Sequence, residues 1–435
     1  MHRVAMSILS PAAERRSFLR AARSTQFSAE IGTELDQFIA CCAALHDDRS
    51  LPFHSPAWLR AWYTTFGRSP GSKPLWLIVR LRASGQVAAL LPLVSRRRGG
   101  LRVVEFADAG VVDYNAPILA PDWHGQLPEK QAAQALWAAV REALAGHDLF
   151  FAHKLLPSAL LEAGDRPNPL ALVLEQRPCE MFGNVFDVAP ESEWETWRRS
   201  LEKRTRKEIE RCWRVFQRSP VARFEHQQDP QQALALFEVL EQQQSQRMKA
   251  LQTPYKLDAP ECKAFYRQLI LDSLSCPNPG SQVVMTALID GDEVVSALFG
   301  LVNGHRYMGL RQSIGGEAWK ACSPARLLDE QTARHFHGQG RQHFDFGIGD
   351  YHHKHALNMR TIALVDACEA LSPRGLPALW GWRLRRRLKS HPRVVALWRR
   401  MGGLRHSQRP AAAAADAAAC EDPQRKNASS GADSI

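Results

Sequence analysis

The chain has 435 residues, of which 45% are hydrophobic and 23% are charged, an ordinary composition for a soluble protein of two or three domains. Its net charge of +11 suits an anionic partner: CoA phosphates, an acidic polysaccharide, anionic lipid or RNA. No apolar run approaches the roughly 20 residues that cross a bilayer, and the N-terminal segment is too interrupted for a signal peptide, so we expect a cytoplasmic protein.

The first half of the chain, residues 31–190, is predicted to be a mixed α/β unit that follows a disordered arm at 1–30. Apolar spacing and turn residues predict its elements. These are helices over 56–66 and 131–145, and strands over 75–81, 87–94, 101–106, 116–119 and 149–155.

A single basic helix from Trp194 to about Gln217 is predicted to link the two halves, within a segment at 191–220. Its apolar residues recur partly at helical spacing, while its many lysines and arginines are too numerous for one narrow face. Two interpretations stay open: a solvated helix that packs its tryptophan edge on a domain, or a basic wall for CoA or an anionic substrate.

The second half, residues 221–375, repeats the element order of the first: an antiparallel meander followed by one helical crossover. A basic helical segment at 376–404 and a disordered tail at 405–435 follow. The predicted elements are helices over 231–248, 259–275 and 324–337, and strands over 283–289, 294–302, 306–312, 343–347 and 361–371. The fold class is α/β, with two domains whose central sheets are mixed and largely antiparallel.

The stretch from Ser323 to Lys354 carries the strongest local signals. Ser323 is a good N-cap residue and Pro324 is placed for the first helical position. The start of such a helix presents unpaired backbone N–H groups and a positive dipole end, which together favour a phosphate or pyrophosphate. The cofactor-binding prediction for this helix start comprises Ser323, Pro324, Ala325 and Arg326.

Three sequence blocks resemble a known family. DFGIGDYHHK (345–354), SPAWLRAW (55–62) with ALLPL (89–93), and DYNAP (113–117) are similar to signature segments of the CelD/BcsL-type acetyltransferases. These belong to the GNAT superfamily and are related to the FemABX aminoacyltransferases. The likeness runs from about residue 53 to 370. Ala325 replaces a glycine that the family often has, and His353-Lys354 replaces its Tyr-Lys.

The resemblance implies two tandem GNAT-like domains, the second catalytic and the first degenerate. It implies an acyl-CoA-dependent N- or O-acyltransferase, with acetyl-CoA as co-substrate, that acts on a sugar or polysaccharide precursor in cellulose or exopolysaccharide biosynthesis. Peripheral contact with a membrane-bound synthase at the inner face of the membrane would fit that role. Two alternatives stay open. The first is a FemABX-like aminoacyltransferase that uses aminoacyl-tRNA, which the basic helix would suit; nucleic acid is expected as a partner under this alternative alone. The second is a non-catalytic accessory protein of a polysaccharide synthase.

The remaining candidate site residues lie on strands and the turns after them. Asp350 is the predicted general base, with a helix cap as its alternative role, and Lys354 can pair with it at i+4. His353 is a further candidate base. Arg311 and Gln312 are predicted to face opposite sides of one strand near the cofactor. Predicted substrate contacts are Asp113, Tyr114 and Asp345.

No metal site is predicted. The nine cysteines show no CxxC spacing, so neither a zinc site nor a disulfide framework is indicated. The adjacent histidines near His353 point apart, and no carboxylate triad accompanies them.

Overall fold

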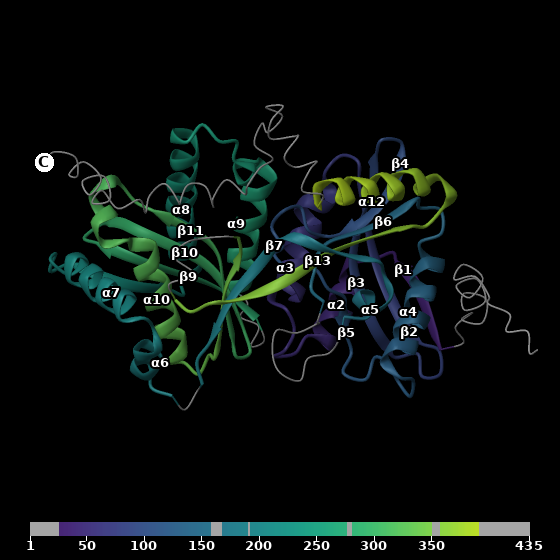
Figure 1. Ribbon diagram of the computed structural model, residues 1–435, viewed down its shortest axis with the longest axis horizontal. Helices are drawn as coiled ribbons and strands as arrows, with labels where there is room; N and C mark the ends of the chain where they lie inside the picture. The colour runs from purple at the N-terminus through teal and green to yellow at the C-terminus, as the bar shows by residue number, and fades with distance from the viewer. Residues whose placement is uncertain (1–25, 158–167, 190–191, 276–280, 350–356, 391–435) are drawn as a thin grey trace, which may run out of the picture. The chain divides into compact units, whose positions relative to one another are not determined.

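The computed structural model describes residues 26–157, 168–189, 192–275, 281–349 and 357–390 (Figure 1). These residues form two compact units. Unit 1 extends to Glu180 and resumes at Ala363, and unit 2 comprises Met181–Ile362. The chain leaves unit 1 within strand β7 (Gln176–Asp187) and returns to it within β13 (Arg360–Ala370). The predicted halves were divided at 190 and 375, so the observed units differ from them at both ends.

Unit 1 is built on a mixed sheet with the strand order β1-β2-β3-β4-β6-β13. The first four strands form an antiparallel meander, β6 lies parallel to β4, and β13 lies antiparallel to β6. The strands are β1 (Phe27–Gly32), β2 (Ser72–Leu81), β3 (Val87–Arg98), β4 (Leu101–Phe106), β6 (Leu149–Leu155) and the short β5 (Ile118–Leu119), which pairs with β3.

The expectation of a disordered arm at 1–30 is wrong for its last residues. Residues 27–30 belong to β1, which pairs with β2 in antiparallel register. Phe27 is fully buried in the core of unit 1, and this apolar burial adds to the pairing that holds the edge strand in place. Residues 1–25 lie outside the described part of the chain.

Helices cover both faces of the unit 1 sheet, as the alternation of side chains along the strands requires. Val104 and Phe150 contribute to the core cluster that contains residues of α4, whereas Val103 and Leu149 pack with Leu379 of α12. The helices of unit 1 are α2 (Leu35–Leu45), α3 (Pro56–Thr65), α4 (Glu129–Ala143), α5 (Pro169–Val173) and α12 (Leu376–Ser390), with 3₁₀ turns at η1 (Pro52–His54), η2 (Phe66–Arg68) and η5 (Pro373–Gly375).

His54 is a buried histidine that connects two loops of unit 1. Its side chain is enclosed, and its Nε2 lies 3.0 Å from the carbonyl oxygen of Ala116. Burial disfavours the charged imidazolium and lowers the pKa of His54 to about 3. The folded protein therefore keeps this ring neutral under conditions in which the unfolded chain protonates it.

Stability should fall as the pH falls below about 6.5, because His54 then binds a proton in the unfolded chain but stays neutral in the folded protein. The contribution of His54 is complete above pH 6.5, the ordinary value, and decreases down to about 3. The expected slope is about 1.4 kcal/mol per pH unit for this one group. Urea unfolding at successive pH values would measure it. His54→Gln keeps a donor for Ala116 and should lose less stability per pH unit; an equal slope in wild type and variant would contradict the assignment.

Unit 2 is built on strands in the order β7-β12-β11-β10-β9-β8. All neighbouring strands are antiparallel except β11 and β12, which are parallel and are joined through helix α10 (Pro324–His337). Parallel neighbours need such a crossover connection. The strands are β8 (Ala222–Gln227), β9 (Ser281–Asp290), β10 (Glu293–Asn303), β11 (Arg306–Ile314) and β12 (His343–Ile348).

The helices of unit 2 lie on both sides of its sheet, with α8 and α9 on one side and α6, α7 and α10 on the other (Figure 1). The predicted single linking helix is wrong: Leu201 is extended (φ −65°, ψ 154°) and separates α6 from α7. Its predicted apolar edge is confirmed, because Trp194, Ile209 and Phe216 are buried. The elements are α6 (Trp194–Ser200), α7 (Lys203–Phe216), α8 (Pro230–Ala250), α9 (Pro260–Ser275), η3 (Lys256–Asp258) and η4 (Glu317–Cys322).

The two units repeat one pattern of strands and connections. Each has an antiparallel meander, a helical crossover to a parallel strand, and a further antiparallel neighbour. This confirms the predicted α/β class with mixed, largely antiparallel central sheets. The predicted helix over 324–337 is confirmed residue for residue, together with its buried stripe that includes Leu327, Leu328 and Phe336.

Candidate functional site

Strand β11 bends in the middle and parts from its parallel neighbour. Arg306–Met308 pair with His343–Asp345 of β12, and within the described residues the ladder between the two strands ends there. On the other side Phe299 faces Arg311 while Gly300 faces Gly309, so Leu310 is an extra residue. Such a bulge increases the local bend and twist. The edge of β11 that follows it therefore leaves β12 and presents backbone groups that no ladder with β12 uses.

Gln312 ties the bent strand to the start of α10. Its Nε2 donates to the carbonyl oxygen of Ala325 at 2.9 Å and to Oδ1 of Asp329 at 2.8 Å. Asp329 is buried, so both bonds are shielded from water. The strand edge and the helix start, two parts of the predicted cofactor site, are thereby held in a fixed relation.

Arg311 points to the opposite face of the sheet, as predicted, and contacts α8. Its Nη1 lies 3.3 Å from Oε1 of Glu241, its Nη2 donates to Oε1 of Gln244 at 2.6 Å, and its guanidinium lies over the rings of Phe237 and Tyr266 at 5.0 and 4.7 Å. The structure therefore does not bring Arg311 to the Ser323–Arg326 turn. Sequence reasoning missed Glu241 and Gln244, which lie about 70 residues away.

The start of α10 has an unusual backbone. Ser323 is left-handed (φ 46°, ψ 61°), and its hydroxyl makes no capping bond to the helix. The predicted side-chain cap is therefore wrong, because capping requires an extended backbone at this position. Pro324 occupies the start of the helix as predicted. A left-handed non-glycine residue costs about 1–3 kcal/mol, and such strain is concentrated at functional turns.

The first turn of α10 leaves backbone donors for a ligand. Leu327 is the first residue whose N–H bonds back, to Ser323 O at 3.2 Å, and Pro324 has no N–H. The N–H groups of Ala325 and Arg326 thus lie at the positive end of the helix dipole. Nε of Arg326 is buried and has no hydrogen-bond partner among the described residues. Together these donors can hold a phosphate or pyrophosphate group.

Basic side chains of α7 reach the residues just before this turn. Nη1 of Arg211 donates to the carbonyl oxygen of Ala321 at 3.0 Å, and Arg211 pairs with Glu208 at 2.7 Å. Hydrogen bonds from Arg211 hold the pKa of the Glu208 carboxyl below its usual value, so this acid stays charged and neutralises only one of the cations. The contact ties this helix to the residues before α10, and both interpretations of its basic residues stay open.

A second basic feature is a hollow of about 780 Å³ between α7, β8 and α10. Arginines of four different elements line it together with three aromatic rings and one acid. Its volume is that of a small-ligand pocket, and its charge favours an anion. The lining includes Arg198, Arg214, Arg223, Arg334, Trp213, Phe216, Phe224 and Glu210.

The end of strand β12 is fixed by an asparagine that sequence reasoning missed. Nδ2 of Asn184, a buried residue of β7, donates to the carbonyl oxygens of Gly347 at 3.0 Å and Gly349 at 2.8 Å. Both glycines have positive φ, 72° and 129°, which explains why glycine occupies them. Asp345 is fully buried and accepts the N–H of Gly347 at 2.8 Å, so the structure places this predicted substrate contact in the interior.

The predicted catalytic residues Asp350, His353 and Lys354 lie outside the described residues. The backbone at Gly349, which Asn184 holds, leads directly into them. Asn184 therefore fixes the point from which the candidate catalytic segment starts.

Asn184→Ala should destabilise unit 2 by about 1–3 kcal/mol, because two buried carbonyls lose their donor. Turnover should fall more than substrate affinity, since the start of the catalytic segment loses its anchor. Denaturant unfolding and steady-state kinetics would measure both. Asn358→Gly is the matched control, because the Asn358 side chain makes an exposed bond to Ser200 O at 3.4 Å and glycine keeps its left-handed backbone (φ 53°) without strain. Equal effects of the two substitutions would show that Asn184 has no special positioning role.

The predicted substrate pair of unit 1 lies in a packed segment. Tyr114 is fully buried, and its ring meets that of Phe53 edge-on with centroids 6.4 Å apart. The next residue, Asn115, donates to His153 O at 2.7 Å and to Asp108 at 3.0 Å. These contacts give the DYNAP segment a structural role in unit 1, and a substrate role for Asp113 and Tyr114 stays a prediction.

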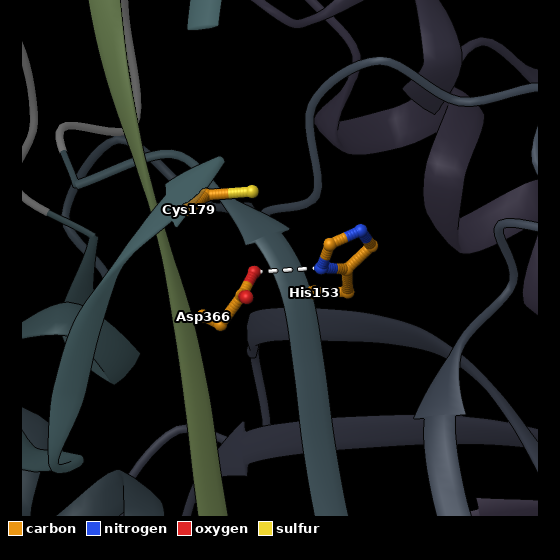
Figure 2. A group of neighbouring side chains, drawn as sticks. All are labelled: His153, Cys179 and Asp366. Carbon is orange, nitrogen blue, oxygen red and sulfur yellow. Dashed lines mark hydrogen bonds and ion pairs between the residues drawn. The ribbon is translucent and has the colours of Figure 1, made fainter. Parts of the chain in front are cut away.

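Unit 1 also brings together three potential metal ligands that lie far apart in the sequence. Atoms of His153, Cys179 and Asp366 lie within 4.8 Å of one another, and Figure 2 shows the Cys179 thiol beside the bond between the other two. A bulge opposite Asp366, with Lys154 at φ 51°, places His153 there. Nδ1 of His153 lies 2.6 Å from Oδ1 of Asp366, so the buried carboxylate is satisfied within the protein, although the three donor types are ones that zinc accepts.

Residues 203–355 match the family model of the acetyltransferase (GNAT) domain. Unit 2 contains a GNAT acyltransferase domain. The matched residues include the bent strand β11, helix α10 and strand β12, which are the elements that form the candidate site. GNAT domains use acyl-CoA generally, and the protein is an acyltransferase. This favours the enzymatic interpretations of the sequence over a non-catalytic accessory protein.

The fold is similar to that of several solved structures at low identity. The C-terminal domain of a putative lysylphosphatidylglycerol synthetase from Agrobacterium fabrum is 11% identical (80% of this chain, 96% of that one; TM-score 0.47). A tandem GNAT protein from the clavulanic acid biosynthesis pathway is 11% identical (80% and 99%; TM-score 0.42), and FemX is 12% identical (77% and 96%; TM-score 0.43). A comparison with proteins of curated function gave no match.

Proposed function

We propose that this acyltransferase moves an acyl group from acyl-CoA to a hydroxyl or amine of a sugar or polysaccharide precursor. The proposed acyl group is acetyl. The observation that supports acyl-CoA as the acyl donor is the hydrogen bond from Gln312 to Ala325 O. It holds the bent edge of β11 next to the free N–H groups at the start of α10. A thioester chain can follow the strand edge while its pyrophosphate binds the helix start.

The residues present fit this donor. Backbone groups of β11 after Gly309 would hold the chain next to the thioester, and the N–H groups of Ala325 and Arg326 with the Arg326 guanidinium would hold the pyrophosphate. In the transfer an acceptor oxygen or nitrogen bonds to the thioester carbonyl carbon, the carbon–sulfur bond breaks, and the acceptor's proton passes to a base. Asp350 is the proposed base; CoA leaves as the thiolate and takes up that proton, from the base or through solvent, to be released as the thiol.

The acceptor class rests on the resemblance to the CelD/BcsL-type acetyltransferases, carried by DFGIGDYHHK and DYNAP. A role in cellulose or exopolysaccharide production follows from it. One observation favours a second candidate, transfer from aminoacyl-tRNA: four arginines and three aromatic rings line the hollow beside α7. Binding of tRNA that weakens steeply with salt, without acyl-CoA binding, would select that candidate.

Titration with a non-hydrolysable acetyl-CoA analogue should saturate at one equivalent per chain and raise the melting temperature. The bulge of β11 has no counterpart in the described part of β4, the corresponding strand of unit 1, which pairs with β3 without a register shift. Isothermal titration calorimetry and a thermal-shift assay would measure both effects. Saturation at two equivalents would mean that unit 1 also binds the donor, and no binding at all would remove acyl-CoA as the donor.

A further inference from the structure

Helix α12 is fastened to unit 1 by one of its faces. Leu379 is buried with Val103, Leu149 and Cys368, and Trp382 packs partly against the same cluster. Arg383 forms an ion pair with Glu175. These contacts on one side decide which side chains of the helix point away from unit 1.

The turn before α12 fixes its direction. A Cβ atom on Gly375 would lie 1.9 Å from the carbonyl oxygen of Asp148, so only glycine fits there. The N–H of Leu371 donates to the same oxygen at 3.0 Å, and the Ser372 hydroxyl donates to the Asp148 carboxylate at 2.8 Å. The start of the helix is therefore held firmly, and the helix crosses the outside of unit 1 (Figure 1).

The outer face of α12 carries an apolar stripe. Leu376, Trp380 and Leu384 are 45%, 67% and 58% exposed, and they follow one another at intervals of four residues, so they lie along one side of the helix. They are half of the six large apolar side chains that are exposed in the described part of the chain, and the other three lie apart from each other in sequence. A tryptophan exposed to this degree at the centre of such a stripe indicates a surface that becomes covered.

The charge of α12 indicates what covers it. The helix contains five basic residues and no acidic one. A protein partner with an apolar groove would need no such excess, whereas a helix that combines exposed tryptophan and leucine with a sequence rich in arginine and lysine is typical of helices that lie in the surface of a membrane. No helix in the described residues is long and apolar enough to span a bilayer.

We infer that α12 docks unit 1 onto an anionic lipid surface. Leu376, Trp380 and Leu384 enter the boundary between headgroups and acyl chains, where a tryptophan ring is favourably placed. The excess of basic residues in the helix sequence adds a salt-dependent attraction to anionic headgroups. The enzyme would thus be a peripheral membrane protein, held by a surface that is separate from the candidate acyl-CoA site of unit 2.

The test is sedimentation of the full chain with vesicles of phosphatidylcholine alone and of phosphatidylcholine mixed with phosphatidylglycerol. Wild type should bind the anionic vesicles at least about tenfold better than the neutral ones, and less at high salt. The double substitution Trp380→Ser/Leu384→Ser should weaken binding to anionic vesicles by about tenfold or more, because two apolar anchors are lost. Both side chains are exposed, so the melting temperature should not change.

Leu251→Ser is the matched control, because Leu251 is 43% exposed and lies in unit 2, at the end of α8; its binding should equal that of wild type. Absence of binding by wild type, or equal binding by the double variant, would overturn the inference. So would concentration-dependent self-association that the double substitution abolishes, because a second copy of the chain would then cover the stripe.

Discussion

Ala325→Glu should reduce the affinity for acyl-CoA by about 100-fold, a loss of about 2.7 kcal/mol. The introduced carboxylate would lie in the first turn of α10, where the N–H groups of Ala325 and Arg326 are proposed to bind the pyrophosphate. Two like charges a few ångströms apart near a protein surface repel each other with about this energy. Calorimetric titration with an acyl-CoA analogue would measure the affinity.

The fold should tolerate this substitution, since a negative charge in the first turn of a helix is stabilising. Ala325→Gln has the same size without the charge and should weaken binding far less, which separates repulsion from bulk. If the acidic and neutral variants bind equally and as tightly as wild type, then the pyrophosphate lies elsewhere.

Arg311→Ala should destabilise unit 2 by about 3–5 kcal/mol. The side chains of Arg311 and Glu241 are only 3% and 9% exposed, so the substitution would leave the carboxylate of Glu241 buried without its guanidinium. It would also remove the cation that lies over the adjacent rings of Phe237 and Tyr266. Urea unfolding followed by circular dichroism would measure the loss.

The double variant Arg311→Met/Glu241→Gln is the informative control, because it removes both charges and keeps most of the volume. It should be less destabilised than Arg311→Ala alone. A loss below about 1 kcal/mol in Arg311→Ala would show that water reaches Glu241 and that the cluster is not a buried ion pair.

Elements with a strong local pattern could be predicted from the sequence. Helix α10 and strand β6 have their predicted bounds, and most other strands differ by one to four residues at an end. Their periodicity and their glycine and proline boundaries are local properties of the chain. The opposite orientation of Arg311 and Gln312 also followed from the alternation along a strand.

Features that depend on distant residues could not be predicted. The buried Glu330 accepts indole N–H bonds from Trp194 at 2.9 Å and Trp213 at 3.2 Å, yet from the sequence it is one acid in an amphipathic helix. Asn184 gave no signal, because the glycines it binds are more than 160 residues away. The break at Leu201 was missed because the residues around it favour a helix on local propensity alone.

The division of unit 1 into two stretches of chain has a consequence during synthesis on the ribosome. Residues 181–362 are made between the two stretches, which takes about 10–40 s at the usual rates of translation. For that time strand β6 lacks its neighbour β13, and Trp137 and Arg141 of α4 lack their partner Glu369. The described part of unit 2 is a single stretch of chain and can fold first. The nascent first half must therefore wait with an open sheet edge, the kind of surface that chaperones protect and that promotes aggregation.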